Sequence, residues 1–248
     1  MKRIVASLII QNNLVVNSYE FKKHLPVGKI ENIIPRLQDW EIDEIAVLNI
    51  THSDNPVKDF DSIFNDRLLA QINTPLSYGG GIDTPEIAER VVNHGCERVI
   101  LSSSNANSGL LSGISQILGE QSILLHCPVE VDICETEKIP KLAFLPEILD
   151  DISKGWGGEI FFKFRTLDGR QTEFDQLNDY ISAIPAKFQN FLVGGGISQI
   201  SKIEEILILP QISGVVIGNW LNNQELVVPR VKVKLKDNLV RKYSGESI

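Results

Sequence analysis

The sequence predicts a (β/α)8 barrel, an α/β fold of the TIM-barrel class, as one domain over residues 1–248. Three observations favour it. The chain has the length typical of this fold, short β-branched segments alternate with helical patterns, and the sequence repeats at half its length. No Gly-, Pro- or Ser-rich linker divides the chain. A doubly wound open sheet is the lesser alternative.

Eight short segments are rich in β-branched residues. Several are apolar on consecutive positions, as in parallel strands covered on both faces. In chain order the predicted strands are Arg3–Ile10, Glu44–Ile50, Thr74–Tyr78, Arg98–Ser102, Ser122–Val131, Glu159–Phe164, Asn190–Val193 and Gly214–Ile217.

Helical patterns lie between these segments. Apolar residues three or four positions apart predict helices around residues 30–37 and 200–207. The run Asp83–Thr84–Pro85–Glu86 predicts a helix start, with a capping side chain, a proline in the first turn and an acid near the positive end of the dipole.

The two halves of the chain resemble each other. Tyr78–Ile82 (YGGGI) returns as Val193–Ile197 (VGGGI), and Glu44-Ile45 returns at the same offset as Glu159-Ile160. We therefore expect half-barrels over about 1–120 and 121–222, with residues 223–248 packing as a last helix.

Composition narrows the classes of function. Acidic residues outnumber basic ones by 32 to 24, a net charge of −8, which disfavours binding to nucleic acid or to anionic lipid. No apolar run is long enough for a membrane helix, and the apolar start after Met1 lacks a cleavage site, so we interpret it as a first strand.

Three cysteines, an odd number, indicate reduced thiols in the cytoplasm. The spacing of His126, Cys127 and Cys134 fits no familiar zinc pattern, so we expect no metal and no cofactor.

Glycine turns are expected at the carboxyl ends of strands three and seven, and small or polar residues end strands four and eight. Such turns let a backbone approach an anion, and the last two strands of a barrel commonly form a phosphate site. The repeat predicts a second site opposite the first, hence a ligand with phosphate at both ends. The simpler alternative is that these glycines only permit tight turns. The residues concerned are Gly80, Gly81, Ser102, Ser103, Gly195, Gly196, Gly218 and Asn219.

Four predicted strands begin with a charge, alternately basic and acidic: Arg3, Glu44, Arg98 and Glu159. All four would lie at the N-terminal mouth of the barrel and could converge there as a neutral ring of ion pairs. Charges at this end usually serve stability, so spacing alone leaves a functional gate as the minority interpretation.

We expect acid–base chemistry at the opposite end of the barrel, where the carboxyl ends of the strands lie. Lys163 interrupts an apolar strand near its carboxyl end, where a lysine can bind phosphate or exchange protons. The other candidates follow strands two, five and six, and each could instead be a solvated loop residue. They are Asn49, His52, Arg165 and Asp168, with Glu130, Asp132 or Cys134 after strand five.

Several segments resemble the cyclase subunit of imidazole glycerol phosphate synthase, of the histidine pathway, in order from Lys2 to about Trp220. They are KRIVASL, IDEIAVLNIT, TPLSYGGGI, GCERVILSSS, GGEIFFKFRTLDG, FLVGGGIS and SGVVIGNW. The resemblance implies a two-fold-repeated barrel that binds a doubly phosphorylated substrate and receives ammonia through its interior. The source of that ammonia would be a glutaminase subunit docked at the N-terminal face.

The resemblance assigns roles to particular positions. The family's phosphate elements are matched at Gly80, Gly81, Ser102, Ser103, Asp168, Gly169, Gly195, Gly196 and Gly218. The four alternating charges fall on the positions of the family's ammonia gate, and Glu97 falls where the family places an acid that contacts the glutaminase.

The family's two catalytic aspartates are not matched. Ile9 occupies the position at the end of strand one, and Pro128 the position at the end of strand five. A shift in alignment would substitute Glu130 or Asp132, so Asp132 and Lys163 are the catalytic candidates. An isoleucine cannot transfer a proton, and ordinary imidazole-ring formation at normal speed is not expected.

Three hypotheses follow. The first is a diverged synthase subunit that conducts ammonia for amination in surface-polysaccharide biosynthesis, where a separate sugar amidotransferase uses it. The second is a genuine histidine-pathway cyclase or isomerase with a rearranged site. The third is a non-catalytic subunit that binds a phosphorylated ligand or acts as a scaffold.

Overall fold

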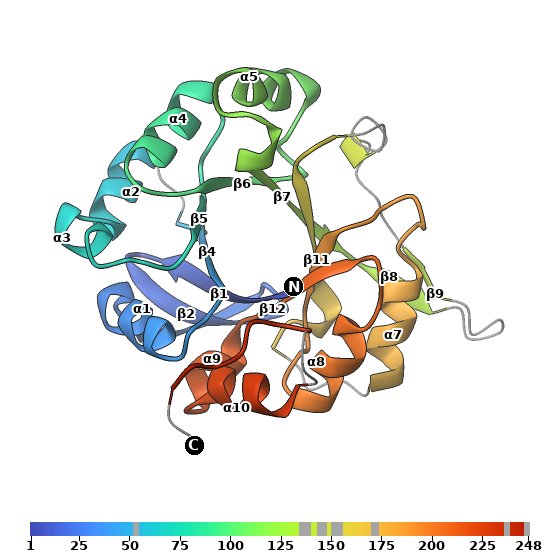
Figure 1. Cartoon of the computed structure of the whole chain (residues 1–248). Coiled ribbons are helices and arrows are strands. Elements are labelled where there is room, and N and C mark those ends of the chain that lie inside the picture. Colours follow the sequence, from blue (N-terminus) through green and yellow to red (C-terminus); the bar gives the residue numbers. More distant parts are fainter. Residues whose placement is uncertain are drawn as a thin grey trace.

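The computed structural model describes residues 1–51, 55–133, 140–142, 148–149, 156–169, 174–235 and 239–245. Eight parallel strands close into a barrel, and helices surround them (Figure 1). The predicted (β/α)8 barrel is thereby confirmed. In order around the barrel the strands are β1 (Arg3–Gln11), β4 (Glu44–Asn49), β5 (Leu76–Gly79), β6 (Arg98–Ser102), β7 (Ile123–Val129), β10 (Glu159–Phe164), β11 (Phe191–Gly194) and β12 (Ile212–Ile217).

The barrel closes where the first strand meets the last. Strand β1 pairs in parallel with β12, in a register that sets Arg3 opposite Gly214 and Ala6 opposite Ile217. On its other side β1 pairs in parallel with β4. The closure leaves no free edge within the wall, and edges are a liability in open sheets.

Helices cover the outer face of the wall. The predicted apolar stripe on α1 is confirmed, because Ile30, Ile33, Ile34 and Leu37 are all buried. The predicted start of α4 is also confirmed, since the Thr84 side chain accepts a hydrogen bond from the amide of Ile87. The α-helices are α1 (Ile30–Asp39), α2 (Pro56–Ile63), α3 (Asp66–Leu69), α4 (Pro85–Asn93), α5 (Ser108–Leu118), α7 (Phe174–Ser182), α8 (Ile200–Leu207), α9 (Asn219–Asn223) and α10 (Val227–Lys234), and short 3-10 turns lie at Glu120–Ser122 and Arg165–Leu167.

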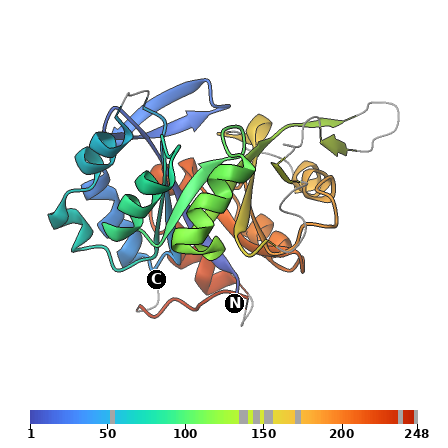
Figure 2. The same ribbon diagram turned by 90° about the horizontal axis from the view of Figure 1, so that it is seen from above.

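A β-hairpin follows β1 that the sequence analysis did not predict. Strands β2 (Leu14–Tyr19) and β3 (Lys23–Gly28) are antiparallel and continue the sheet from β1. The first turn consists of Asn12 and Asn13, both with positive φ (51° and 62°), as a two-residue hairpin turn requires. Figure 2 shows the hairpin at the end of the barrel opposite the two termini.

The segment predicted as one strand, Ser122–Val131, is divided in the structure. Ser122 belongs to a 3-10 turn, β7 ends at Val129, and Val131 begins the short strand β8 (Val131–Ile133), which pairs with β9 (Pro140–Leu142) away from the wall. Pattern alone could not find this break, because β-branched residues continue across it.

The core is divided by the barrel wall. Side chains on the outer face pack under the helices as one large cluster. A second, smaller layer fills the interior and consists of Val5, Ala46, Ile100, Leu124, Phe161, Leu192 and Val216, all almost completely buried. Within the described ranges, none of the helices combines the length and the hydrophobicity needed to span a bilayer.

Candidate functional site

The four charges that begin strands β1, β4, β6 and β10 form a closed ring of ion pairs. Arg3 pairs with Glu44 (Nη1–Oε2, 3.1 Å) and with Glu159, and Arg98 pairs with Glu159 (Nη1–Oε2, 2.6 Å) and with Glu44. The ring lies inside the N-terminal mouth, because these positions alternate with residues that face the helices. Each arginine therefore contacts both carboxylates, and the ring is neutral.

Hydroxyl groups complete the ring. Ser77 donates to Glu44 Oε1 (2.9 Å), and Ser213 donates to Glu159 Oε1 (2.6 Å). The Glu44 side chain is only 3% exposed, whereas that of Arg3 is 33% exposed, so Arg3 is the member nearest to solvent. Burial lowers the pKa of Arg98, but the carboxylates of Glu44 and Glu159 outweigh this effect and raise that pKa above its ordinary value.

The apolar interior layer lies directly above the ring. Along β1 the inward positions are Arg3, then Val5, and along β10 they are Glu159, then Phe161. An ion would lose its hydration in this layer without any compensating partner, and this costs far more free energy than burying a small uncharged molecule. The interior thus separates a charged lower end from a polar upper end.

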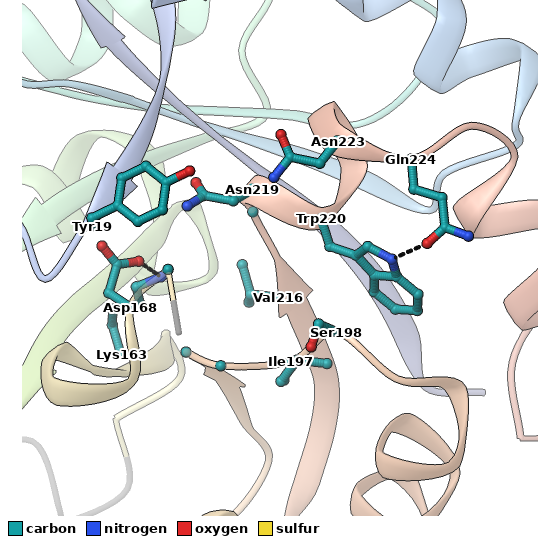
Figure 3. A pocket seen from close by; sticks show the side chains of 14 residues that line it. Tyr19, Lys163, Asp168, Ile197, Ser198, Val216, Asn219, Trp220, Asn223 and Gln224 are labelled. Carbon is teal, nitrogen blue, oxygen red and sulfur yellow. Dashed lines mark hydrogen bonds and ion pairs between the residues drawn. The ribbon is translucent and has the colours of Figure 1, made fainter. Parts of the chain in front are cut away.

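A polar pocket of about 340 Å³ opens at the upper end, over the carboxyl ends of β11 and β12 (Figure 3). We call it the β11–β12 pocket. Both glycines of the turn after β11 have positive φ, 116° at Gly195 and 68° at Gly196. The lining residues predicted for phosphate are Asp168, Gly169, Gly195, Gly196, Gly218 and Asn219.

Lys163 and Asp168 form one wall of this pocket (Figure 3). Lys163 Nζ lies 2.7 Å from Asp168 Oδ1, and both side chains are less than a tenth exposed. The second carboxylate oxygen of Asp168 accepts a hydrogen bond from Ser18 Oγ (2.7 Å) in the hairpin. Gly169 has φ 71°, and a Cβ there would meet the Ser18 carbonyl oxygen at 2.6 Å, so this turn requires glycine.

A second pocket of about 460 Å³ lies over the carboxyl ends of β5 and β6. We call it the β5–β6 pocket. Its turn repeats the backbone shape of the first, with φ 142° at Gly80 and 66° at Gly81. Ser102 lines this pocket, as do Ile9 and Pro128. Ser103 is not among the lining residues, because it is buried and its amide donates to the His126 carbonyl (2.9 Å).

His126 is the buried titratable side chain of the β5–β6 pocket. Its ring lies between Phe161 below it and Phe21 of the hairpin, with ring centroids 5.1 and 6.5 Å away. Burial lowers the pKa of His126 to about 3, and the nearby charge of Lys163 contributes. Among the described residues, none hydrogen-bonds its buried Nε2 atom. The imidazole is therefore neutral at physiological pH.

Of the remaining candidates, Arg165 and Asn49 also line the β5–β6 pocket. Arg165 pairs with Glu130 (3.3 Å), and Asn49 donates to the Tyr78 hydroxyl (3.2 Å). His52 and Cys134 lie outside the described residues, and for Asp132 the description covers the backbone of β8 but not the side chain. Among the described residues, no three His, Cys, Asp or Glu side chains cluster as metal ligands.

Several residues of these sites were not singled out from the sequence. Ser18 and Phe21 come from the unpredicted hairpin, and Ser77 and Ser213 are serines at strand starts with no motif of their own. The Asn12-Asn13 pair between two apolar runs was the available signal for the hairpin. Nothing in the sequence signals which hydroxyl groups bond the ring.

Comparison with known proteins gives the family. A family profile described as "Histidine biosynthesis protein" matches residues 3–140. A provisionally named imidazole glycerol phosphate synthase subunit HisF of Leptospira interrogans is 33% identical over 125 residues, 50% of this chain and 48% of the relative. The chain thus spans about half the length of that relative.

Two further relatives match over longer stretches. A protein of Vibrio vulnificus with the provisional name imidazole glycerol phosphate synthase subunit hisF3 is 29% identical over 182 residues, 70% of each chain. The imidazole glycerol phosphate synthase subunit HisF of Tolumonas auensis is 21% identical over 258 aligned positions, 97% of this chain and 98% of the relative. Because the family profile covers more than half of the chain and the fold is a (β/α)8 barrel, this chain belongs to the histidine biosynthesis protein family.

Proposed function

We propose that this protein is the synthase-type subunit of a glutamine amidotransferase complex. A glutaminase partner docks at the N-terminal face, ammonia passes along the barrel axis, and a phosphorylated sugar-type ligand binds at the carboxyl-terminal face. The observation that carries the proposal is the closed, neutral ring of Arg3, Glu44, Arg98 and Glu159 across the lower mouth.

The ring and the layer above it suit ammonia. The ring offers hydrogen-bonding groups at the entrance, and the partial exposure of Arg3 gives this side chain room to move aside. The apolar layer excludes ammonium, because an uncompensated charge is costly to bury, but it admits the uncharged molecule. Ammonia would then arrive beneath both upper pockets as a nucleophile.

Glu97 suits a contact with the partner. It is exposed and lies immediately before β6, next to Arg98 of the ring. A residue at this point can couple docking of the partner to the state of the ring. We therefore include Glu97 in the proposed docking surface.

The chemistry at the upper end differs, in this proposal, from ordinary imidazole-ring formation. Ile9 and Pro128, at the family's two aspartate positions, line the β5–β6 pocket and can neither donate nor accept a side-chain proton. A barrel that has the ring of charges but lacks those two acids fits a different use of ammonia. We propose that the ammonia aminates a phosphorylated sugar in surface-polysaccharide biosynthesis, with a separate sugar amidotransferase as the enzyme that accepts it. Lys163 and Asp132 remain the catalytic candidates.

Reconstitution with a purified glutaminase subunit from the same organism tests the proposal. We expect a stable complex in which this protein stimulates glutamate release about tenfold. Arg3→Gln should still bind the partner but lose most of the stimulation, because the ring then lacks its most exposed member. Arg90→Gln, on the outer helix α4, is the matched control and should behave as the parent protein. Failure to form a complex, or full stimulation by Arg3→Gln, would refute the proposal.

The histidine pathway is the second candidate, supported by the names of the relatives. Complementation separates the two functions. A strain that lacks the cyclase subunit should not grow without histidine when it expresses this protein. Growth would show that the rearranged site still closes the imidazole ring.

A further inference from the structure

The two upper pockets are chemically unequal, although the sequence repeat relates them. The β5–β6 pocket has mostly apolar walls, contributed by β1, β4, β6, the hairpin and α5. The apolar lining residues include Ile9, Phe21, Leu48, Ile50, Ile100 and Leu110. Hydroxyl and amide side chains dominate the β11–β12 pocket instead, with Tyr19, Ser198, Asn219 and Asn223 around the glycine turn.

The backbone after β6 has few donors left for an anion. The amides of Asn105 and Ala106 both donate to the Ser102 carbonyl, at 3.0 and 2.8 Å, and the Ser103 amide donates to the His126 carbonyl. The Ser102 hydroxyl is 2.7 Å from the Ser104 hydroxyl and bonds it. A phosphate that used these groups would have to break these bonds, since phosphate sites depend on converging N–H and O–H donors.

The charges of the β5–β6 pocket do not favour a phosphate either. Its cation, Arg165, is paired with Glu130 and lies over the face of Phe21. Asp83 adds a carboxylate to the lining. His126, whose pKa is about 3, contributes an uncharged ring.

The β11–β12 pocket has groups that suit a phosphate. Lys163 in its wall is also paired with a carboxylate, that of Asp168, but its side chain is 9% exposed against 44% for Arg165, so water screens its charge less. The Ser198 hydroxyl oxygen is buried, and none of the described residues hydrogen-bonds it. A buried hydroxyl without a partner costs free energy unless a ligand or water satisfies it.

Building on the proposed function, we infer that the ligand carries a single phosphate, which binds in the β11–β12 pocket, while an uncharged and partly apolar portion occupies the β5–β6 pocket. The neutral His126 ring is one of the polar groups of the pocket that this portion would meet. The substrate class is thus a singly phosphorylated compound, rather than one with phosphate at both ends as the repeat predicts.

Titration of the full chain with inorganic phosphate tests the inference. We expect calorimetry to give one site per chain. In ¹H–¹⁵N spectra the amides around Gly195–Ser198 and Gly218–Trp220 should shift, and those around Gly80–Ile82 and Ser102–Asn105 should not. Two equivalent sites, or shifts at the β5–β6 turns, would overturn the inference and leave the ammonia conduit intact. No phosphate binding at all would overturn both the inference and the phosphorylated-ligand part of the proposed function.

A matched pair of serine variants locates the site independently. Ser198→Asp and Ser102→Asp each place a carboxylate in one pocket. We expect Ser198→Asp to weaken phosphate binding at least tenfold by charge repulsion, and Ser102→Asp to change it less than twofold. A loss of phosphate binding in Ser102→Asp as large as or larger than that in Ser198→Asp would contradict the inference. Circular dichroism checks that each variant folds. If Ser198→Asp does not fold, Ser198→Ala replaces it and should still weaken phosphate binding, by less than tenfold, whereas Ser102→Ala should leave it unchanged.

Discussion

At the scale of single residues, the lower mouth of the barrel depends on charges that satisfy one another. Glu44 is the most buried member of the ring and accepts hydrogen bonds from Arg3, Arg98 and Ser77. Removing one partner of a buried pair is costly because the other charge stays buried without compensation. The ring therefore has a structural role in addition to the one proposed for it.

Glu44→Gln should lower the free energy of unfolding by about 3 kcal/mol, because two arginines then share one carboxylate. Urea denaturation measures the change. Glu97→Gln is the control, since Glu97 is exposed and close in sequence to the ring, and it should change stability by less than about 0.5 kcal/mol. Equal effects of the two substitutions would show that the ring contributes nothing to stability.

His126 should make the protein acid-sensitive. Its pKa is about 3 in the folded protein against 6.5 ordinarily, so between these values the unfolded chain binds a proton that the folded protein does not. The stability that this difference contributes is fully present above pH 6.5 and is lost as the pH falls, with a slope of up to about 1.4 kcal/mol per pH unit.

His126→Gln should remove this slope from the dependence of unfolding free energy on pH between about 6 and 4. Denaturation at a series of pH values gives the comparison, with His94→Gln as the control for replacing an exposed histidine. An unchanged slope in His126→Gln would show that the folded protein binds the proton after all.

At the scale of elements, side-chain amides fasten the hairpin to α9. Asn219 accepts from the Ser18 amide (3.0 Å) and donates to the Ser18 carbonyl (2.6 Å), as a neighbouring strand would. Asn17 donates to Asn223 (2.8 Å) and accepts from Asn222 (2.9 Å). These bonds hold the hairpin tip, which carries Phe21, over both upper pockets. Asn219, which makes two of them, is itself in the wall of the β11–β12 pocket.

Asn219→Ala should release the hairpin, because it leaves both backbone groups of Ser18 without a partner. Losing this pair of bonds should lower the free energy of local opening by at least about 1.4 kcal/mol, which corresponds to about tenfold faster trypsin cleavage after Lys22 and Lys23. Gln224→Ala is the matched control, because the Gln224 side chain accepts a hydrogen bond from Trp220 and, among the described residues, none from the hairpin. Equal cleavage rates in the two variants would mean that the asparagine contacts do not hold the hairpin.

At the scale of the whole molecule, closure of the barrel joins the first strand to the last. Gly214 lies opposite Arg3 at this seam, and a Cβ at Gly214 would meet the Arg3 carbonyl oxygen at 2.5 Å and a Leu192 methyl at 3.0 Å. The close approach of backbone to backbone is what makes glycine necessary here. The seam also sets the position of Arg3 in the ring.

Gly214→Ala should destabilise the protein by about 2 kcal/mol, because the added methyl group pushes β12 away from β1. The shift in thermal midpoint measures it. Gly28→Ala provides a control in which the added Cβ meets nothing within 4 Å, so its effect should stay within about 0.5 kcal/mol. A Gly214→Ala protein as stable as Gly28→Ala would mean that the seam tolerates a wider spacing.

The sequence by itself determined the barrel, the strand-by-strand alternation and the turns at Gly80 and Gly195, because periodicity and glycine placement are local properties of the chain. It also placed the four charges of the lower mouth at the starts of their strands. It did not determine the β2–β3 hairpin. Two asparagines between two apolar runs are equally consistent with the end of one strand and with a turn into a second strand.

Only the tertiary structure decided how these parts meet. Arg3 and Glu159 are more than a hundred and fifty positions apart, and barrel closure alone brings them into contact. The same closure sets the hairpin over both upper pockets and turns Ser103 away from one of them. Side chains that line a pocket come from strands distant in sequence, so the unequal chemistry of two pockets with similar glycine turns follows from packing and not from the repeat.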